Sequence, residues 1–174
     1  MLDLLKLFFS IAILKKGPQD VPYSRFLFVA MLVVIFITDL VSNQLLVKTG
    51  EQLDVKNLIL FLVLANVIVY GLTYLLVYLH GFANRAIQTM TALLGVELII
   101  MLAQLPIFFL LQFAEQNRNA LILLYYITIG WELVANVHIY RHALSISAVR
   151  ASLITLVLFS LQIFLVLKFF PEGS

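Results

Sequence analysis

Five long apolar stretches, separated by short polar connections, constrain the fold of this chain more than any other feature. Crossing about 30 Å of hydrocarbon takes roughly 20 helical residues at 1.5 Å each, and each stretch is long enough. Because three of the four connections are short, consecutive helices must run antiparallel. The sequence therefore predicts an all-α polytopic membrane bundle in which residues 17–174 form one five-span transmembrane domain. The expected spans are approximately residues 24–46, 58–79, 89–113, 121–140 and 146–169.

Composition excludes a soluble domain. Of the 174 residues, 63% are hydrophobic and 11% are charged, whereas soluble domains have about 45–50% and about 25%. A small soluble domain leaves a large fraction of its surface in water, so it could not bury this much apolar area. The net charge of +2 gives no reason to expect nucleic acid, and the absence of cysteine excludes disulfides and thiolate metal sites. The first partner that the sequence predicts is the lipid bilayer.

Residues 1–16 form a separate amphipathic segment. Asp3, Lys6 and Ser10 share one narrow polar stripe of a helix, and apolar residues cover the rest. The apolar run is too short to span a bilayer. A cleaved signal peptide is the alternative, but Asp3 lies where basic residues belong and no small-residue cleavage site follows. We therefore expect an interfacial helix that lies on the membrane.

Basic residues are unevenly divided between the two ends of the predicted bundle. Seven lie at the end that carries the N-terminus and four at the opposite end, so the positive-inside rule predicts a cytoplasmic N-terminus and an external C-terminus. Six of the seven are expected to bind lipid headgroups. They are Lys15, Lys16, Arg25, Arg85, Arg141 and Arg150.

Three carboxylates fall inside predicted spans, where an ionised side chain costs about 2.5–3.5 kcal/mol on insertion scales. Glu97 and Glu132 each lie about eight residues, or roughly 12 Å, from the inner ends of spans three and four. Asp39 on span one and Asn66 on span two are expected at matching depths near mid-membrane. Asn136 shares a helix face with Glu132. We predict an intramembrane polar cluster formed by Asp39, Asn66, Glu97, Glu132 and Asn136.

This cluster has two interpretations. It could be a proton- or ion-linked core, as in a small transporter or channel component. Alternatively, Glu97, Glu132 and Asn136 hydrogen-bond one another and hold the helices together. The second is preferred because no inverted repeat and no matched pair of broken spans is visible. It fits a non-enzymatic accessory, scaffold or assembly subunit, whose lead helix docks a membrane partner or a second copy. A weaker third possibility is lipid handling, suggested by the basic rim.

His138 and His142 lie four residues apart, a spacing that can bind a metal on one helix face. Arg141 between them opposes a divalent cation, and the glutamate base of the metalloprotease helix is missing. No phosphate-binding loop, nucleophile elbow or calcium loop is present in the sequence. We therefore expect no metal, no cofactor and no enzymatic activity.

The lead segment ends in Gly17-Pro18, the five spans are closely spaced, and Trp131 lies in the fourth span. A basic turn is followed by small residues at the start of the last span: Ser145, Ser147, Ala148 and Ala151. In these features the chain resembles the Ypt-interacting-protein (Yip) family, in its bacterial type. The resemblance implies a five-span bundle without catalysis, working as a membrane scaffold or partner-binding subunit. We expect the bacterial inner (plasma) membrane as the location.

Overall fold

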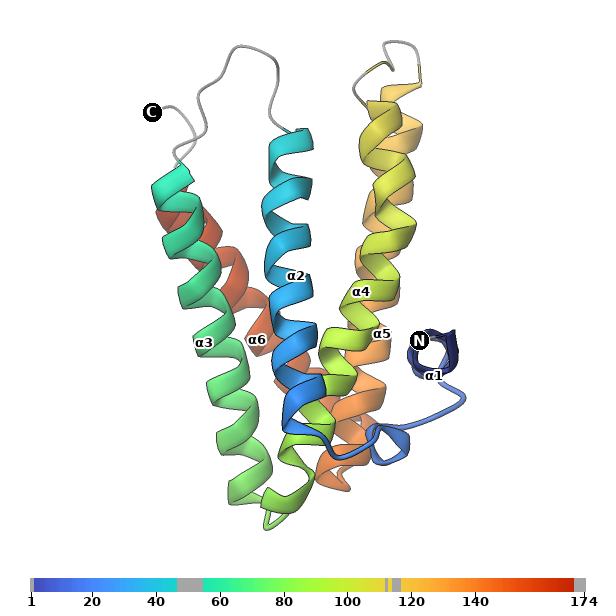
Figure 1. Cartoon of the computed structure of the whole chain (residues 1–174), viewed down its shortest axis with the longest axis vertical. Coiled ribbons are helices and arrows are strands. Elements are labelled where there is room, and N and C mark those ends of the chain that lie inside the picture. The colour runs from blue at the N-terminus through green and yellow to red at the C-terminus, as the bar shows by residue number, and fades with distance from the viewer. Residues whose placement is uncertain (1, 47–54, 112, 114–116, 171–174) are drawn as a thin grey trace.

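The computed structural model describes residues 2–46, 55–111, 113 and 117–170, and in this part of the chain all regular structure is helical (Figure 1). Five helices are long and apolar enough to cross a membrane. The predicted all-α bundle with five spans and a short N-terminal helix is thus confirmed, and the chain is a polytopic membrane protein. The elements are α1 (Leu2–Ala12), η1 (Pro18–Asp20), α2 (Arg25–Leu46), α3 (Val55–Leu79), η2 (Ala83–Arg85), α4 (Ala86–Leu111), α5 (Arg118–Leu144) and α6 (Ala148–Phe169).

Several helices extend beyond the apolar stretches that predict them. α5 begins three residues before residue 121 and ends four residues after residue 140, because its backbone stays helical through Arg141 and His142 after hydropathy has fallen. It ends at Ser145, whose φ of 53° and ψ of 41° are left-handed. α6 then starts after Ser147, whose hydroxyl accepts from the amide of Arg150 at 3.4 Å. α4 continues through Pro106.

α4 lies at the centre of the bundle. It contacts α1, α2, α3 and α5, and every residue from Thr89 to Val96 is buried. A helix surrounded in this way must be apolar all round, which explains why its sequence shows no polar face. The best-packed core lies near the end of the bundle where α3 turns into α4 and α5 into α6. Its fully buried side chains include Ile35, Val77, Leu94, Ile139 and Leu144.

α1 packs across α4 and α5, and Figure 1 views it nearly down its axis while those helices run vertically. Phe8, Ile11 and Ala12 are at most 1% exposed. The Phe8 ring lies over Gly95 of α4, where a Cβ atom would overlap the ring. The indole N–H of Trp131 donates to the Ala12 carbonyl at 2.7 Å.

The segment after α1 is also attached to the bundle. Nε2 of His138 lies 3.0 Å from the Lys16 carbonyl, and the Gln88 side-chain amide donates to the Val21 carbonyl at 2.7 Å. The lead helix was expected to offer its apolar face to a partner. Most of that face is instead occupied by α4 and α5 of the same chain, because glycine at position 95 leaves room for an aromatic ring.

Candidate functional site

A cavity of about 350 Å³ lies among the five long helices. Its lining runs along α5 from Tyr125 to Tyr140, which corresponds to about 22 Å along the helix axis. Every long helix contributes side chains, from Asp39 of α2 to Gln162 of α6. The cavity is therefore inside the part of the protein that spans the bilayer.

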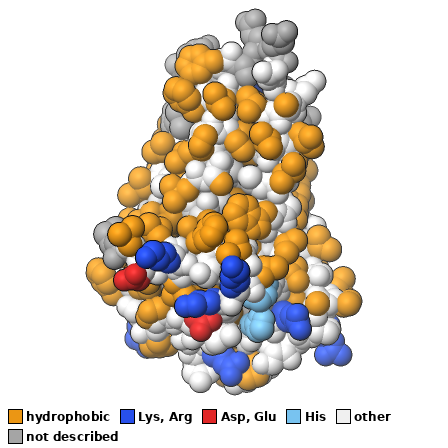
Figure 2. All heavy atoms as spheres, turned by 90° about the vertical axis from the view of Figure 1, so that its right-hand side faces the viewer, with side chains coloured by type: hydrophobic (Ala, Val, Ile, Leu, Met, Phe, Trp, Pro, Cys, Tyr) orange, Lys and Arg blue, Asp and Glu red, His pale blue; other side chains and the backbone are white. Residues whose placement is uncertain are grey.

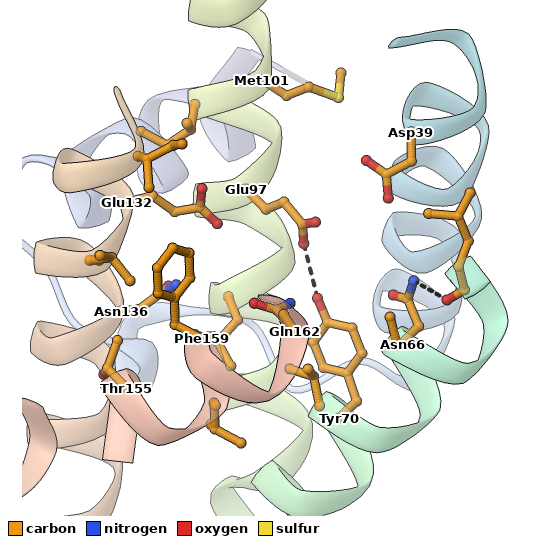
Figure 3. Close-up of a pocket in the computed structure, with 18 of the residues that line it drawn as sticks. Asp39, Asn66, Tyr70, Glu97, Met101, Glu132, Asn136, Thr155, Phe159 and Gln162 are labelled. Atoms are coloured by element: carbon orange, nitrogen blue, oxygen red, sulfur yellow. Dashed lines mark hydrogen bonds between the residues drawn. The ribbon is translucent and has the colours of Figure 1, made fainter. Parts of the chain in front are cut away.

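Three carboxyl groups from three different helices point into this cavity: Asp39 of α2, Glu97 of α4 and Glu132 of α5 (Figure 3). Asn66 and Asn136 line the same space. The structure thus brings all five residues of the predicted polar cluster to one cavity, although their functional role stays a prediction.

Glu97 and Glu132 lie at nearly matched positions along their helices. Because α4 begins at Ala86 and α5 ends at Leu144, they are 11 and 12 residues from those ends. At 1.5 Å per residue this is about 17–18 Å along each helix axis. The expected depth of roughly 12 Å below the membrane face stays a prediction, because the helices extend beyond the apolar stretches.

Tyr70 of α3 is the partner that sequence reasoning missed. Its hydroxyl donates to Oε2 of Glu97 at 3.0 Å (Figure 3), and only 9% of the residue is exposed. The available signal was its position four residues after Asn66, which places both on one face of α3. Glu97 was expected to hydrogen-bond Glu132 or Asn136 instead. Those two residues make no side-chain hydrogen bond to any other described residue, and both line the cavity.

Two polar pairs hold the helices on either side of the carboxyl groups. Towards one end, the hydroxyls of Thr73 and Tyr140 lie 2.8 Å apart and join α3 to α5. Towards the other end, the Gln104 amide donates to Thr128 at 2.9 Å and joins α4 to α5. The Gln104–Thr128 bond joins the two helices that present Glu97 and Glu132, and the Thr73–Tyr140 bond ties the second of them to α3. The cavity therefore has a defined shape in the absence of any bond between those carboxyl groups.

The charge of the lining has one sign. Among the described residues that line the cavity, three are acidic and none is lysine, arginine or histidine. An ionised carboxylate at this depth needs a cationic partner or a proton, since the surrounding medium has a low dielectric constant. The arrangement suits the binding of a cation or the exchange of protons.

No protein-family model, curated protein or solved structure matches this chain. The resemblance to the Yip family accordingly stays a prediction.

The six residues predicted to bind headgroups gather at one end of the bundle, outside the cavity. Five are exposed: Lys15, Lys16, Arg25, Arg141 and Arg150. Arg85 is half-buried, with its guanidinium 4.5 Å from the centre of the Phe82 ring. Figure 2 shows lysine, arginine and histidine side chains in the lower part of one face, with hydrophobic side chains above them. Such a division suits a membrane boundary, but contact with headgroups stays a prediction.

The His138 and His142 rings lie 4.4 Å apart between centroids. Nε2 of His138 is already engaged with the Lys16 carbonyl. Within the described residues, no three His, Asp or Glu side chains are close enough to hold a metal ion together, and this includes Asp39, Glu97 and Glu132. The position of His138 is better explained by its contact with the lead segment.

Proposed function

We propose that this protein binds a cation inside the bilayer and works, without catalysing a reaction, as a small proton- or cation-linked transport component. The observation that carries the proposal is the single cavity lined by Asp39, Glu97 and Glu132 with no basic side chain among its described lining residues. Intramembrane carboxylates that face a cavity commonly mark ion or proton pathways. The structure thus favours the interpretation that the sequence alone ranked second.

A purely structural role for these carboxyl groups is less well supported. Side chains that hold transmembrane helices together do so by hydrogen-bonding across the interface. Glu97 does so with Tyr70, but Glu132 makes no hydrogen bond to another described residue and points into the cavity (Figure 3). A carboxyl group left without such a bond is costly in a membrane unless it has a ligand or water to contact.

Flux in proteoliposomes tests the proposal. Purified protein is reconstituted, a Na⁺, K⁺ or pH gradient is imposed, and its decay is followed with a trapped fluorescent dye selective for Na⁺, K⁺ or H⁺, respectively. We expect the wild type to dissipate at least one gradient about tenfold faster than empty liposomes. Glu97→Gln and Glu132→Gln should each remove most of this flux, because the amide cannot ionise.

Asp3→Asn is the matched control, since Asp3 is an exposed carboxylate on α1, outside the cavity lining. It should keep the wild-type rate. Equal rates for empty liposomes, wild type and both glutamine variants would refute a transport role.

The role preferred from the sequence, an accessory, scaffold or assembly subunit that associates with a membrane partner or a second copy, stays a prediction. The Yip resemblance points the same way. Purification in a mild detergent tests it, and a strictly monomeric protein without a bound partner would contradict it. The proposed setting for either role is the bacterial inner membrane, with the N-terminus in the cytoplasm.

A further inference from the structure

A second cavity, also of about 350 Å³, lies between α2 and α3. Its lining is almost entirely apolar: Phe28, Leu32 and Phe36 of α2, Val63, Val67, Gly71 and Tyr74 of α3, and Met90 of α4. We refer to it as the α2–α3 groove. Several of these side chains, including Val63 and Val67, are exposed, so the groove opens on the outer surface of the bundle.

The groove and the acidic cavity adjoin. Asn66 and Tyr70 line both. Tyr70 contacts each side with a different part of its side chain: the hydroxyl donates to Glu97 at 3.0 Å, and the ring meets the edge of Phe28 at 6.3 Å between centroids. Asn66 and Tyr70 therefore lie where the apolar space meets the acidic one.

The two spaces also follow one another along α2. Phe28, Leu32 and Phe36 recur every four residues and line the groove over about 12 Å of helix. Asp39, the α2 carboxylate of the acidic cavity, comes less than one turn after Phe36. An elongated molecule lying along α2 would meet hydrocarbon surface first and carboxylate at its end.

We propose that the two cavities form one bipartite site for an amphiphilic cation, with its cationic head in the acidic cavity and its hydrocarbon tail in the α2–α3 groove. This inference rests on the proposed cation site. An inorganic cation would leave the groove unused, and an anionic or neutral head would not match three carboxyl groups. A phospholipid would place its head at the basic end of the bundle, away from Asp39. Entry through the groove would bring the ligand from the lipid phase.

Binding to protein in nanodiscs tests the proposal with two radiolabelled probes, tetramethylammonium and decyltrimethylammonium. Uptake by empty nanodiscs is subtracted. We expect the decyl compound to bind the wild type at least about tenfold more tightly than the bare head. Glu97→Gln, with Glu132→Gln as a second variant, should lower the affinity for both probes by about tenfold or more, because the cationic head then faces one carboxylate fewer.

Gly71→Leu adds a side chain to the lining of the groove, and its Cβ atom meets nothing within 4 Å. In this variant, the affinity for the decyl compound should fall to within about threefold of the affinity for tetramethylammonium. The affinity for tetramethylammonium itself should not change. Gly130→Leu is the matched control, because Gly130 has equally open surroundings on α5 and lines neither cavity. It should bind both probes as the wild type does.

Three outcomes would overturn the proposal. Equal affinities of the two probes for the wild type, or an unchanged decyl affinity in Gly71→Leu, would show that the groove holds no tail. Equal competition by neutral decyl maltoside would show a groove for lipid chains alone. In each case, the proposed cation site would still be supported if tetramethylammonium bound to the wild type and Glu97→Gln abolished that binding. Failure of both probes to bind in a Glu97-dependent way would remove the proposed function as well.

Discussion

At the scale of single residues, Tyr70 has the most consequential position in the structure. It is the hydrogen-bond partner of Glu97, packs edge-on against Phe28, and lines both cavities. A side-chain hydrogen bond between transmembrane helices contributes about 0.6 kcal/mol on average and up to about 1.7 kcal/mol, because the unfolded chain also finds partners. Tyr70 is therefore expected to matter moderately for stability and strongly for how Glu97 is presented.

Tyr70→Phe removes the hydroxyl and keeps the ring. We expect the free energy of unfolding to fall by about 0.5–1.5 kcal/mol, measured by steric trapping in bicelles. Tyr126→Phe is the control, since Tyr126 is 62% exposed on α5. Equal losses in the two variants would mean that the bond to Glu97 adds nothing to stability.

At the scale of elements, α1 is joined to the bundle by shape and by one indole hydrogen bond. Phe8 occupies the space that Gly95 leaves open, and Trp131 donates to the last residue of α1. Glycine in a helix interior usually costs about 1 kcal/mol relative to alanine. Its presence in the middle of α4 is explained by the ring that lies over it.

Gly95→Leu should displace α1, because any side chain at this position overlaps Phe8. Trp131 is the only tryptophan in the chain, so its fluorescence reports the contact directly. We expect its emission maximum to shift and its quenching by brominated lipids to increase. Gly71→Leu, on the open face of α3, should leave both unchanged. Identical spectra for wild type and Gly95→Leu would contradict the docked position of α1.

At the scale of the whole molecule, the bundle divides into a packed end and an end that surrounds the acidic cavity. The packed end carries the turns from α3 to α4 and from α5 to α6, together with six basic residues. If this end faces the cytoplasm, cations attracted to the cavity enter from the other side or from the lipid. Orientation therefore decides the direction of any transport.

Reporter fusions determine this orientation. Alkaline phosphatase joined after residue 174 should be active, and the same enzyme inserted in the 80–86 turn should be inactive, because seven basic residues favour a cytoplasmic N-terminal side over four at the other. Green fluorescent protein at both positions should give the reverse pattern. Phosphatase activity at the turn with none at the C-terminus would invert the proposed topology.

The sequence by itself determined the five spans, their antiparallel order and the approximate level of each polar residue. These follow from local properties, since hydropathy and a rise of 1.5 Å per residue require no knowledge of neighbours. Depth matching alone grouped Asp39, Asn66, Glu97, Glu132 and Asn136, and all five line one cavity.

Only the tertiary structure decided how each helix is rotated. Helices that are apolar nearly all round carry no periodic signal for which face looks inward. In the structure, packing contacts set the inward face of each helix. They include the Phe8 ring on Gly95, the Thr73–Tyr140 pair and the Gln104–Thr128 pair, and the resulting arrangement leaves a cavity between the carboxyl groups. For the same reason the Tyr70–Glu97 bond and the α2–α3 groove could not be read from the sequence, because both depend on contacts between helices that are distant along the chain.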